Sequence, residues 1–287
     1  MIEPELLDRI QKHAREWRVA VEDSFETATS AIAFGKHHQK PVVLKVVKRP
    51  GDEWRSGEIL EAFDGGGIVR VYEHAPGAVL MERLRPGNSL ASLALNGRDE
   101  EATEILGAVI QQMSAIERSS SDESSFTTVH DWAGGFERYI ASGDKKIPRH
   151  LVEAGQRIYL HLCASLRQPR LLHGDLQHYN VLFDSDRGWV AIDPKGVVGD
   201  LEYELGAILR NPFEQPDLFL SVMTIEKRLK QLTSRLSLDL ERARAWVFAQ
   251  AVLSAIWDIE DGFVVNEGTS SVRLAQTVRP AVDRIRY

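Results

Sequence analysis

The pattern of apolar and polar positions divides the chain into a strand-rich first part and a helical second part. Leu6, Leu7, Ile10, Ala14 and Trp17 recur at helical spacing, which predicts an amphipathic helix at the start. Short runs rich in β-branched residues follow, separated by Gly, Pro and charged clusters, as antiparallel strands would be. These runs are VVLKVVK (42–48), IVRVYEH (68–74) and AVLMERL (78–84), with a helical segment, DEWRSGEILEAF (52–63), between the first two.

After residue 84 the pattern changes to long helical stripes. Apolar positions recur at helical spacing from Ile105 to Ile116, and further helical patterns cover about 148–166 and 238–259. The sequence therefore predicts an α+β protein with two lobes: a small β-rich N-lobe over residues 1–84 and a larger, mainly helical C-lobe over residues 85–287.

Composition and charge restrict the partners that this chain can bind. With 287 residues and 43% hydrophobic residues it has the composition of a globular protein. Its formal net charge of -7 provides no general positive field for a nucleic acid, so a nucleic-acid partner is not expected. A cationic small molecule suits this charge better.

Cysteine content and the N-terminal segment bear on the compartment. The single cysteine, Cys163, excludes an internal disulfide and a zinc site built from several cysteines. The first residues lack the basic start and apolar run of a signal peptide, and no apolar run has the length of a membrane span. We expect a cytoplasmic protein without a membrane partner.

The segment NVLFDSDRGWVAIDP predicts a hairpin that carries metal ligands, because two apolar runs flank a turn-rich DSDRG. If Phe183 pairs with Trp189, then Asn180 lies opposite Ile192, and the side chains of Asn180 and Asp193 lie at the same end of the hairpin. Their amide and carboxylate oxygens are ligands that suit a Mg²⁺ ion carrying the phosphates of a substrate.

Asp175, five residues before Asn180, is the candidate catalytic base. It lies on the loop that leads into the first strand of the hairpin, where it can orient or deprotonate an attacking hydroxyl group without binding the metal. Taken singly, Asp175, Asn180 and Asp193 are each ordinary turn or strand-end residues. Their combination in HGDLQHYN followed by IDP favours the catalytic interpretation.

Lys45 is the candidate phosphate-binding residue. Strand alternation places its ammonium group on an apolar face, which is costly unless an anionic partner is present. Glu53 lies seven residues before Leu60 and so shares its helical face, which makes Glu53 a candidate partner for Lys45. Glu58 is the competing candidate.

The motifs HGDLQHYN and IDPKG resemble those of the aminoglycoside phosphotransferase family, which has a protein-kinase-like fold. Residues 171–212 are most similar to its streptomycin 6-kinase and hydroxyurea kinase branch. The resemblance implies that Asp175 is the catalytic base and that Asn180 and Asp193 bind Mg²⁺.

The same resemblance implies a nucleotide site in the N-lobe. Lys45, paired with Glu53, would hold the phosphates of ATP, the cosubstrate. The segment MERL (81–84), with Glu82 and Leu84, would be the hinge whose main-chain groups hold the adenine edge.

Two departures from protein kinases are visible. The segment DSFETATSAIAFG lacks the closely spaced glycines that protein kinases place over ATP, although its hydroxyl side chains are available to a phosphate. After IDPKG there is no long activation segment, only a predicted helix at LEYELGAIL, which argues against a protein substrate.

The acceptor site is predicted from the acidic stretch WDIEDGF, which follows an apolar helical run. Trp257, Asp258 and Asp261 are the candidate substrate-binding residues, because carboxylates match the ammonium or guanidinium groups of an aminoglycoside. Solvent-exposed acidic residues at a helix end are the alternative interpretation.

The leading hypothesis is therefore an ATP- and Mg²⁺-dependent kinase that phosphorylates a hydroxyl of an aminoglycoside, with streptomycin as the first candidate and antibiotic inactivation as the result. An alternative keeps the chemistry and changes the acceptor to hydroxyurea or another small metabolite alcohol. A minor alternative is an ATP-binding pseudokinase that acts through a partner, and a metal-dependent hydrolase has thinner support. The oligomeric state is left open.

Overall fold

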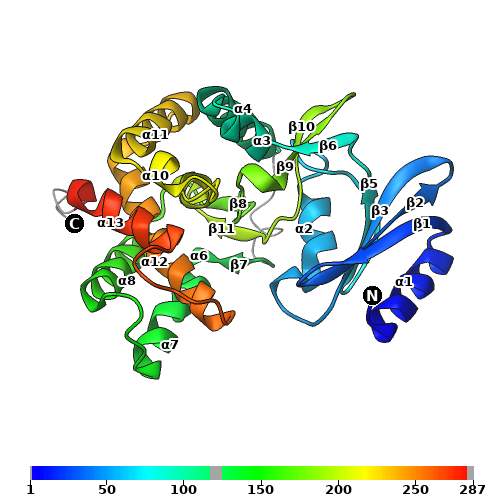
Figure 1. Cartoon of the computed structure of the whole chain (residues 1–287), viewed down its shortest axis with the longest axis horizontal. Coiled ribbons are helices and arrows are strands. Elements are labelled where there is room, and N and C mark those ends of the chain that lie inside the picture. The colour runs from blue at the N-terminus through cyan, green and yellow to red at the C-terminus, as the bar shows by residue number, and fades with distance from the viewer. Residues whose placement is uncertain (1, 117–124, 283–287) are drawn as a thin grey trace. The chain divides into compact units, whose positions relative to one another are not determined.

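The computed structural model describes residues 2–116 and 125–282, which form two compact units (Figure 1). The strand-rich unit contains residues 2–89, 109–116 and 181–195, and the helical unit contains residues 90–108, 125–180 and 196–282. The predicted α+β class, with strands gathered in one part and helices in the other, is confirmed.

The strand-rich unit is built around a five-stranded antiparallel sheet. Its strands, in their order across the sheet, are β1 (Val19–Glu26), β2 (Ser30–His37), β3 (Lys40–Val47), β5 (Ala78–Glu82) and β4 (Val71–Ala75). The predicted first helix is present as α1 (Pro4–Glu16), whose Leu6, Ile10 and Ala14 pack with Val42 and Leu44 on one face of the sheet. Helix α2 (Ser56–Ala62), which directly follows the 3₁₀ helix η1 (Asp52–Arg55), lies on the opposite face (Figure 1).

Strands β1 and β2 were not predicted from the hydrophobic pattern. Within β1 only Val19 is buried, because β1 is the edge strand and the side chains on both of its faces meet solvent or are half-buried. An edge strand of this kind lacks the alternation on which strand prediction depends.

A second, three-stranded sheet joins the predicted hairpin to the N-terminal part of the chain. Strand β9 (Val181–Asp184) pairs with β10 (Gly188–Ala191) on one side and with β6 (Pro86–Ser89) on the other. Phe183 lies opposite Trp189, so the predicted register is confirmed. This pairing groups residues 85–89 and 181–195 with the N-terminal strands, whereas the predicted boundary follows residue 84.

The helical unit is organised around α12, a helix that is buried on nearly all sides and is therefore apolar all round. Helices α7, α8, α9, α11 and α13 pack against it. The helices of this unit are α3 (Ala91–Leu95), α6 (Val129–Trp132), α7 (Gly134–Ser142), α8 (Arg149–Ala164), α9 (Leu205–Leu209), α10 (Pro216–Phe219), α11 (Val222–Leu236), α12 (Leu240–Glu260) and α13 (Ser270–Val282). Helix α4 (Asp99–Ser114) begins in this unit, and its residues from 109 onward belong to the strand-rich unit. The helical unit also contains the 3₁₀ helices η2 (His178–Asn180) and η3 (Leu201–Glu204). Its three short strands, β7 (Thr127–Thr128), β8 (Arg170–Leu172) and β11 (Val197–Gly199), form a sheet in the order β7-β11-β8.

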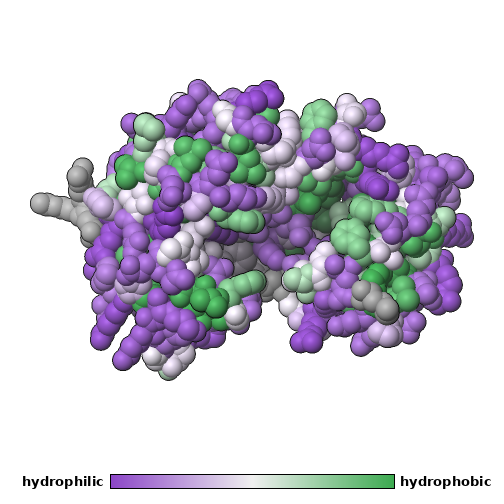
Figure 2. Space-filling model, in the orientation of Figure 1, coloured by the Kyte–Doolittle hydropathy of each residue, from purple (hydrophilic) through white to green (hydrophobic). Residues whose placement is uncertain are grey.

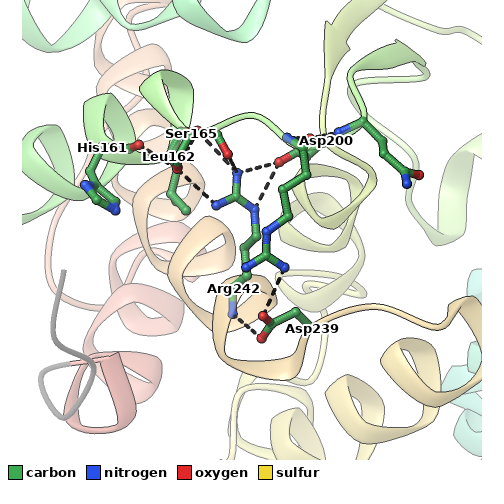
Figure 3. A network of polar contacts seen from close by, with 8 residues as sticks. His161, Leu162, Ser165, Asp200, Asp239 and Arg242 are labelled. Atoms are coloured by element: carbon green, nitrogen blue, oxygen red, sulfur yellow. Dashed lines mark hydrogen bonds and ion pairs between the residues drawn. The ribbon is translucent and has the colours of Figure 1, made fainter.

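A buried ion pair anchors the start of α12 (Figure 3). Arg242 donates from Nε to Asp200 at 3.0 Å, and its Nη2 donates to the carbonyl oxygens of Leu162 and Ser165 at 3.3 and 2.9 Å. The side chains of Arg242 and Asp200 are only 7% and 2% exposed. Asp239 caps the helix by accepting hydrogen bonds from the first amide groups of α12. The network therefore ties α12 to the end of α8 and to the segment after β11.

The face drawn in Figure 2 is mostly hydrophilic, with hydrophobic residues in separate areas. Within residues 2–116 and 125–282, none of the helices combines the length and the apolar character that crossing a bilayer requires.

Candidate functional site

The predicted functional residues fall into two groups, one in each unit. In the strand-rich unit Lys45, Glu82, Leu84 and Asp193 line a pocket of about 530 Å³, whereas Glu53 is not among its lining residues. Val43, Val69 and Leu182 contribute to its apolar wall, and Lys45 and Asp193 contribute charged groups. Apolar walls with a few fixed polar groups are typical of a small-molecule site.

Lys45 makes the contact that the sequence predicted. Its side chain is 7% exposed, and its Nζ lies 2.8 Å from Glu53 Oε2 and also contacts Asp193 Oδ1. Glu58 instead pairs with Arg55 near the surface. The structure therefore selects Glu53 as the partner of Lys45, on the 3₁₀ helix η1 rather than on the α-helix that follows.

Glu53 holds a second lysine. Its other carboxylate oxygen, Oε1, lies 2.9 Å from the Nζ of Lys195. Burial by itself would raise the pKa of Glu53, but the ammonium groups of Lys45 and Lys195 outweigh it and lower the pKa to about 2. Glu53 is therefore a fixed negative charge between two cations. Sequence reasoning assigned no role to Lys195, although Lys195 lies in the motif IDPKG, two residues after Asp193.

Asp193 is held in an unusual backbone conformation. Its φ angle is +62°, in the left-handed region that non-glycine residues rarely adopt. Such conformations persist only where the surrounding contacts impose them, and they concentrate at functional sites. The carboxylate of Asp193 is 38% exposed and so remains accessible to a ligand.

The predicted hinge residues line the pocket, but the side chain of Glu82 has another role. Glu82 and Leu84 both contribute to the pocket wall. The carboxylate of Glu82 forms an ion pair with Arg187 and accepts a hydrogen bond from the amide of Arg70 at 2.7 Å. Arg187 also donates to the carbonyl of Gly65 at 2.7 Å, so this cluster fastens the β9–β10 hairpin. Nucleotide binding by main-chain groups of residues 81–84 remains a prediction.

The segment without closely spaced glycines, residues 23–35, covers the end of β1, the turn at residues 27–29 and most of β2. Thr27, Thr29 and Ser30 line the pocket. The hydroxyl groups of Thr27 and Ser30 lie 2.9 Å apart and are hydrogen-bonded to each other, and the amide of Thr27 donates to the carbonyl of Ser30 at 2.7 Å. Side-chain hydrogen bonds therefore stabilise this turn.

In the helical unit, Asp175 and Asn180 contact each other directly. The Asn180 side-chain nitrogen donates to the carbonyl oxygen of Asp175 at 2.9 Å and to its carboxylate Oδ2 at 3.3 Å. Because the nitrogen is used in this way, the amide oxygen is the atom of Asn180 that suits a cation. The arrangement fits the predicted metal-ligand role.

Arg210 binds the other oxygen of Asp175. Its Nη2 lies 3.0 Å from Asp175 Oδ1, and its Nη1 donates to the buried Gln250 at 3.0 Å. The side chains of Arg210 and Asp175 are 16% and 28% exposed. Sequence reasoning missed Arg210, whose position just after α9 only the fold brings to the catalytic loop.

Glu204 binds the backbone of the loop that carries Asp175. It is 2% exposed, and it accepts hydrogen bonds from the amides of His173 and Gly174, directly before Asp175. Burial raises the pKa of Glu204 to about 7, and the charge of Asp175 adds to this shift although the backbone hydrogen bonds oppose it.

The raised pKa predicts a pH dependence of stability. The unfolded chain releases this proton near pH 4.5, whereas the folded chain keeps it until about pH 7. The Glu204 contribution to the free energy of unfolding is therefore fully present below about pH 4.5 and falls by up to about 3 kcal/mol as pH rises to about 7. Urea unfolding at about pH 5 and about pH 8 should show this loss in the wild type and not in Glu204→Gln. Equal pH dependence in both proteins would contradict the assignment.

The predicted acceptor residues lie around the end of α12. Trp257 packs edge-on against Trp132, with ring centroids 5.2 Å apart. Asp258 accepts a hydrogen bond from Ser271 at 3.0 Å, and burial raises its pKa, although the nearby positive charge of Arg210 opposes this. Asp261 is exposed at the C-terminal end of the helix. The charge of Asp258 is therefore close enough to Arg210 to interact with it.

Glu260, in the same acidic stretch, forms an ion pair with Arg138 at 2.8 Å. Its charge is therefore balanced by a protein side chain. This leaves Asp258 and Asp261 as the better candidates for a cationic ligand.

No group of three or more His, Cys, Asp and Glu side chains is arranged as a metal site in the part of the chain that the structure describes. The metal-ligand roles of Asn180, in the helical unit, and of Asp193, in the strand-rich unit, stay predictions.

The family model and the related proteins that match this chain point to the same family. The family model described as aminoglycoside/hydroxyurea antibiotic resistance kinase matches residues 16–262. A streptomycin 3''-kinase from Klebsiella pneumoniae is 33% identical over 250 residues, which cover 86% of this chain and 91% of the relative. A hydroxyurea phosphotransferase from Kitasatospora aureofaciens is 31% identical over 249 residues, which cover 79% of this chain and 68% of the relative.

Solved structures show the same fold at lower identity. The aminoglycoside phosphotransferase APH(4)-Ia, as a thermostable mutant in a ternary complex with ADP and hygromycin B, matches with a TM-score of 0.65 and 15% identity, covering 94% of this chain and 97% of that one. The choline kinase LicA from Streptococcus pneumoniae matches with a TM-score of 0.62 and 16% identity, covering 97% and 99%. The predicted kinase-like fold is therefore confirmed.

Proposed function

The chain belongs to the aminoglycoside/hydroxyurea antibiotic resistance kinase family, and we propose that it transfers the γ-phosphate of ATP to a hydroxyl group of an aminoglycoside, with streptomycin as the favoured acceptor. The observation that carries this proposal is the buried Lys45, whose ammonium group lies between Glu53 and Asp193 at the wall of the pocket. A buried lysine with acidic partners in a pocket is the arrangement that phosphoryl transfer requires.

Each half of the site has a distinct task in this proposal. The apolar walls of the pocket, with Leu84 in the segment after β5, receive the base of the nucleotide, and Lys45 binds its phosphates. Asp193 and the amide oxygen of Asn180 would hold Mg²⁺, which when bound neutralises phosphate charge.

Asp175 acts on the acceptor. Its carboxylate orients the attacking hydroxyl group and takes the proton as the bond to phosphorus forms. Arg210 and Asn180 fix the position of the carboxylate through one hydrogen bond to each oxygen. Most of the rate acceleration then comes from positioning and charge neutralisation.

A cationic acceptor agrees with the local charges. Asp258 and Asp261 are candidates for binding an ammonium or guanidinium group, because within residues 2–116 and 125–282 neither carboxylate forms an ion pair like that of Glu260 with Arg138. The relatives include a streptomycin 3''-kinase and streptomycin 6-kinases, so the acceptor hydroxyl is not specified by the family.

A second candidate acceptor is hydroxyurea. It is supported by the relative that is a hydroxyurea phosphotransferase at 31% identity. This small neutral molecule would not need the acidic residues at the end of α12, so substitution of Asp258 and Asp261 separates the two candidates.

The proposal is tested by measuring ADP release from Mg²⁺-ATP with streptomycin, other aminoglycosides, hydroxyurea and no acceptor. We expect turnover that depends on streptomycin, with a product heavier by one phosphoryl group in mass spectrometry. Hydroxyurea-dependent turnover would select the second candidate. ATP binding without stimulation by any acceptor would reject both acceptors and favour a pseudokinase.

A further inference from the structure

We propose that Lys195 is a positioning residue that, through Glu53, holds Asp193 in the geometry needed to bind a metal–nucleotide complex. This inference rests on the proposed function, because it concerns the same nucleotide site. It assigns a task to a residue outside the expected set of a phosphate-binding lysine, its glutamate and a metal-binding aspartate.

The contacts form a closed ring of charges within the strand-rich unit. Lys45 binds Glu53 Oε2 at 2.8 Å and also contacts Asp193, and Lys195 binds Glu53 Oε1 at 2.9 Å. Lys195 and Asp193 are separated by one residue, Pro194, so the main chain closes the ring. Displacing Asp193 from Lys45 therefore strains the contact between Lys195 and Glu53.

The ring of contacts stabilises an unusual backbone conformation at Asp193. Its φ of +62° is unfavourable for a residue with a side chain. Pro194 lacks an N–H group and so cannot stabilise the turn by donating a hydrogen bond. Side-chain contacts on both sides of the proline hold this segment: Asp193 contacts Lys45, and Lys195, directly after the proline, binds Glu53.

The burial of Glu53 distinguishes this contact from an ordinary surface ion pair. Exposed ion pairs contribute little to stability, because solvent screens their charges. The Glu53 side chain is only 11% exposed and is shared by two lysines, while Lys195 is 30% exposed. When Lys195 is replaced, Lys45 still has Glu53 as its partner. The substitution therefore disturbs the position of Asp193 more than that of Lys45.

This difference predicts a specific pattern in nucleotide binding. In Lys195→Met the affinity for a fluorescent ADP analogue without metal, measured in EDTA, stays within about twofold of the wild type, because Lys45 and the pocket are intact. The increase in affinity on adding Mg²⁺ falls by about tenfold, the usual effect of losing one charge-assisted contact. Lys195→Arg restores most of the increase, because it keeps the charge.

Fluorescence titration in EDTA and in Mg²⁺ provides the measurement, with circular dichroism to show that each variant is folded. The matched control is Lys227→Met, which removes a lysine from an exposed ion pair with Glu100 and should change neither affinity. A double-mutant cycle with Glu53→Gln should be non-additive, because both substitutions break the same contact.

Three results would overturn the inference. They are an unchanged Mg²⁺ effect in Lys195→Met, an equal loss of affinity in EDTA and in Mg²⁺, and additive effects of Lys195→Met and Glu53→Gln. Equal losses would instead make Lys195 a direct phosphate contact. If the variants show the predicted binding pattern and the wild type phosphorylates no acceptor, the proposed function is refuted and this inference stands.

Discussion

Replacement of Asp175 by alanine is expected to lower acceptor-dependent phosphoryl transfer by about 10³-fold, within the range usual for loss of a general base. The carboxylate is held on one oxygen by Arg210 at 3.0 Å and on the other by Asn180 at 3.3 Å, so its orientation is fixed before an acceptor arrives. Nucleotide binding should stay within about twofold, because Asp175 is not among the residues of the pocket in the strand-rich unit.

The measurement is steady-state ADP release with the best acceptor, together with nucleotide affinity by fluorescence. Asp175→Asn should be equally inactive, because it keeps the shape and removes the proton acceptor. Asp186→Ala, at an exposed position in the β9–β10 turn, is the control and should retain full activity. An Asp175→Ala protein with activity within tenfold of the wild type would show that another group takes the proton.

Replacement of Asp200 by alanine is expected to lower the free energy of unfolding by about 3–5 kcal/mol, because it leaves the Arg242 guanidinium buried without its counter-charge. The substitution also removes the acceptor for the amides of Arg167 and Gln168, at 2.9 and 3.1 Å. The result should appear as a lower urea midpoint with little change in the slope.

The control for this loss of stability is a substitution that breaks an ion pair at the surface. Glu153→Gln breaks the contact with Arg149, whose side chain is 90% exposed, and should change stability by less than about 0.5 kcal/mol. Asp200→Asn should be intermediate, because its oxygen still accepts the backbone hydrogen bonds. A loss of stability in Asp200→Ala no larger than that in Glu153→Gln would contradict the role assigned to this network in Figure 3.

Much of the candidate site was visible in the sequence because its residues follow short-range rules. The hairpin register follows from two apolar runs and one turn, and the structure pairs Phe183 with Trp189 as predicted. Glu53 was one of two candidates for Lys45, and helical periodicity favoured it because it shares a face with Leu60. The roles of Asp175, Asn180 and Asp193 remain predictions, and the experiments above address them.

The residues that sequence reasoning missed act over long distances in the chain. Arg210 lies 35 residues after its partner Asp175, and Lys195 lies 142 residues after its partner Glu53. Arg187 reaches Glu82 across 105 residues. Lys195 lies in the motif IDPKG and Arg187 in the turn DSDRG, but neither motif indicates a partner more than 100 residues away in the chain. Arg210 lies in none of these motifs.

The sequence by itself determined the α+β class, the main helices, the hairpin and the family, because hydrophobic periodicity, turn residues and motif spacing are properties of neighbouring positions. Only the tertiary structure decided that the hairpin joins the N-terminal strands, that Glu53 rather than Glu58 meets Lys45, and that Glu53 also holds Lys195. The physical reason is that charge pairing depends on distance and burial in space. Folding sets these quantities for residues that the sequence keeps far apart.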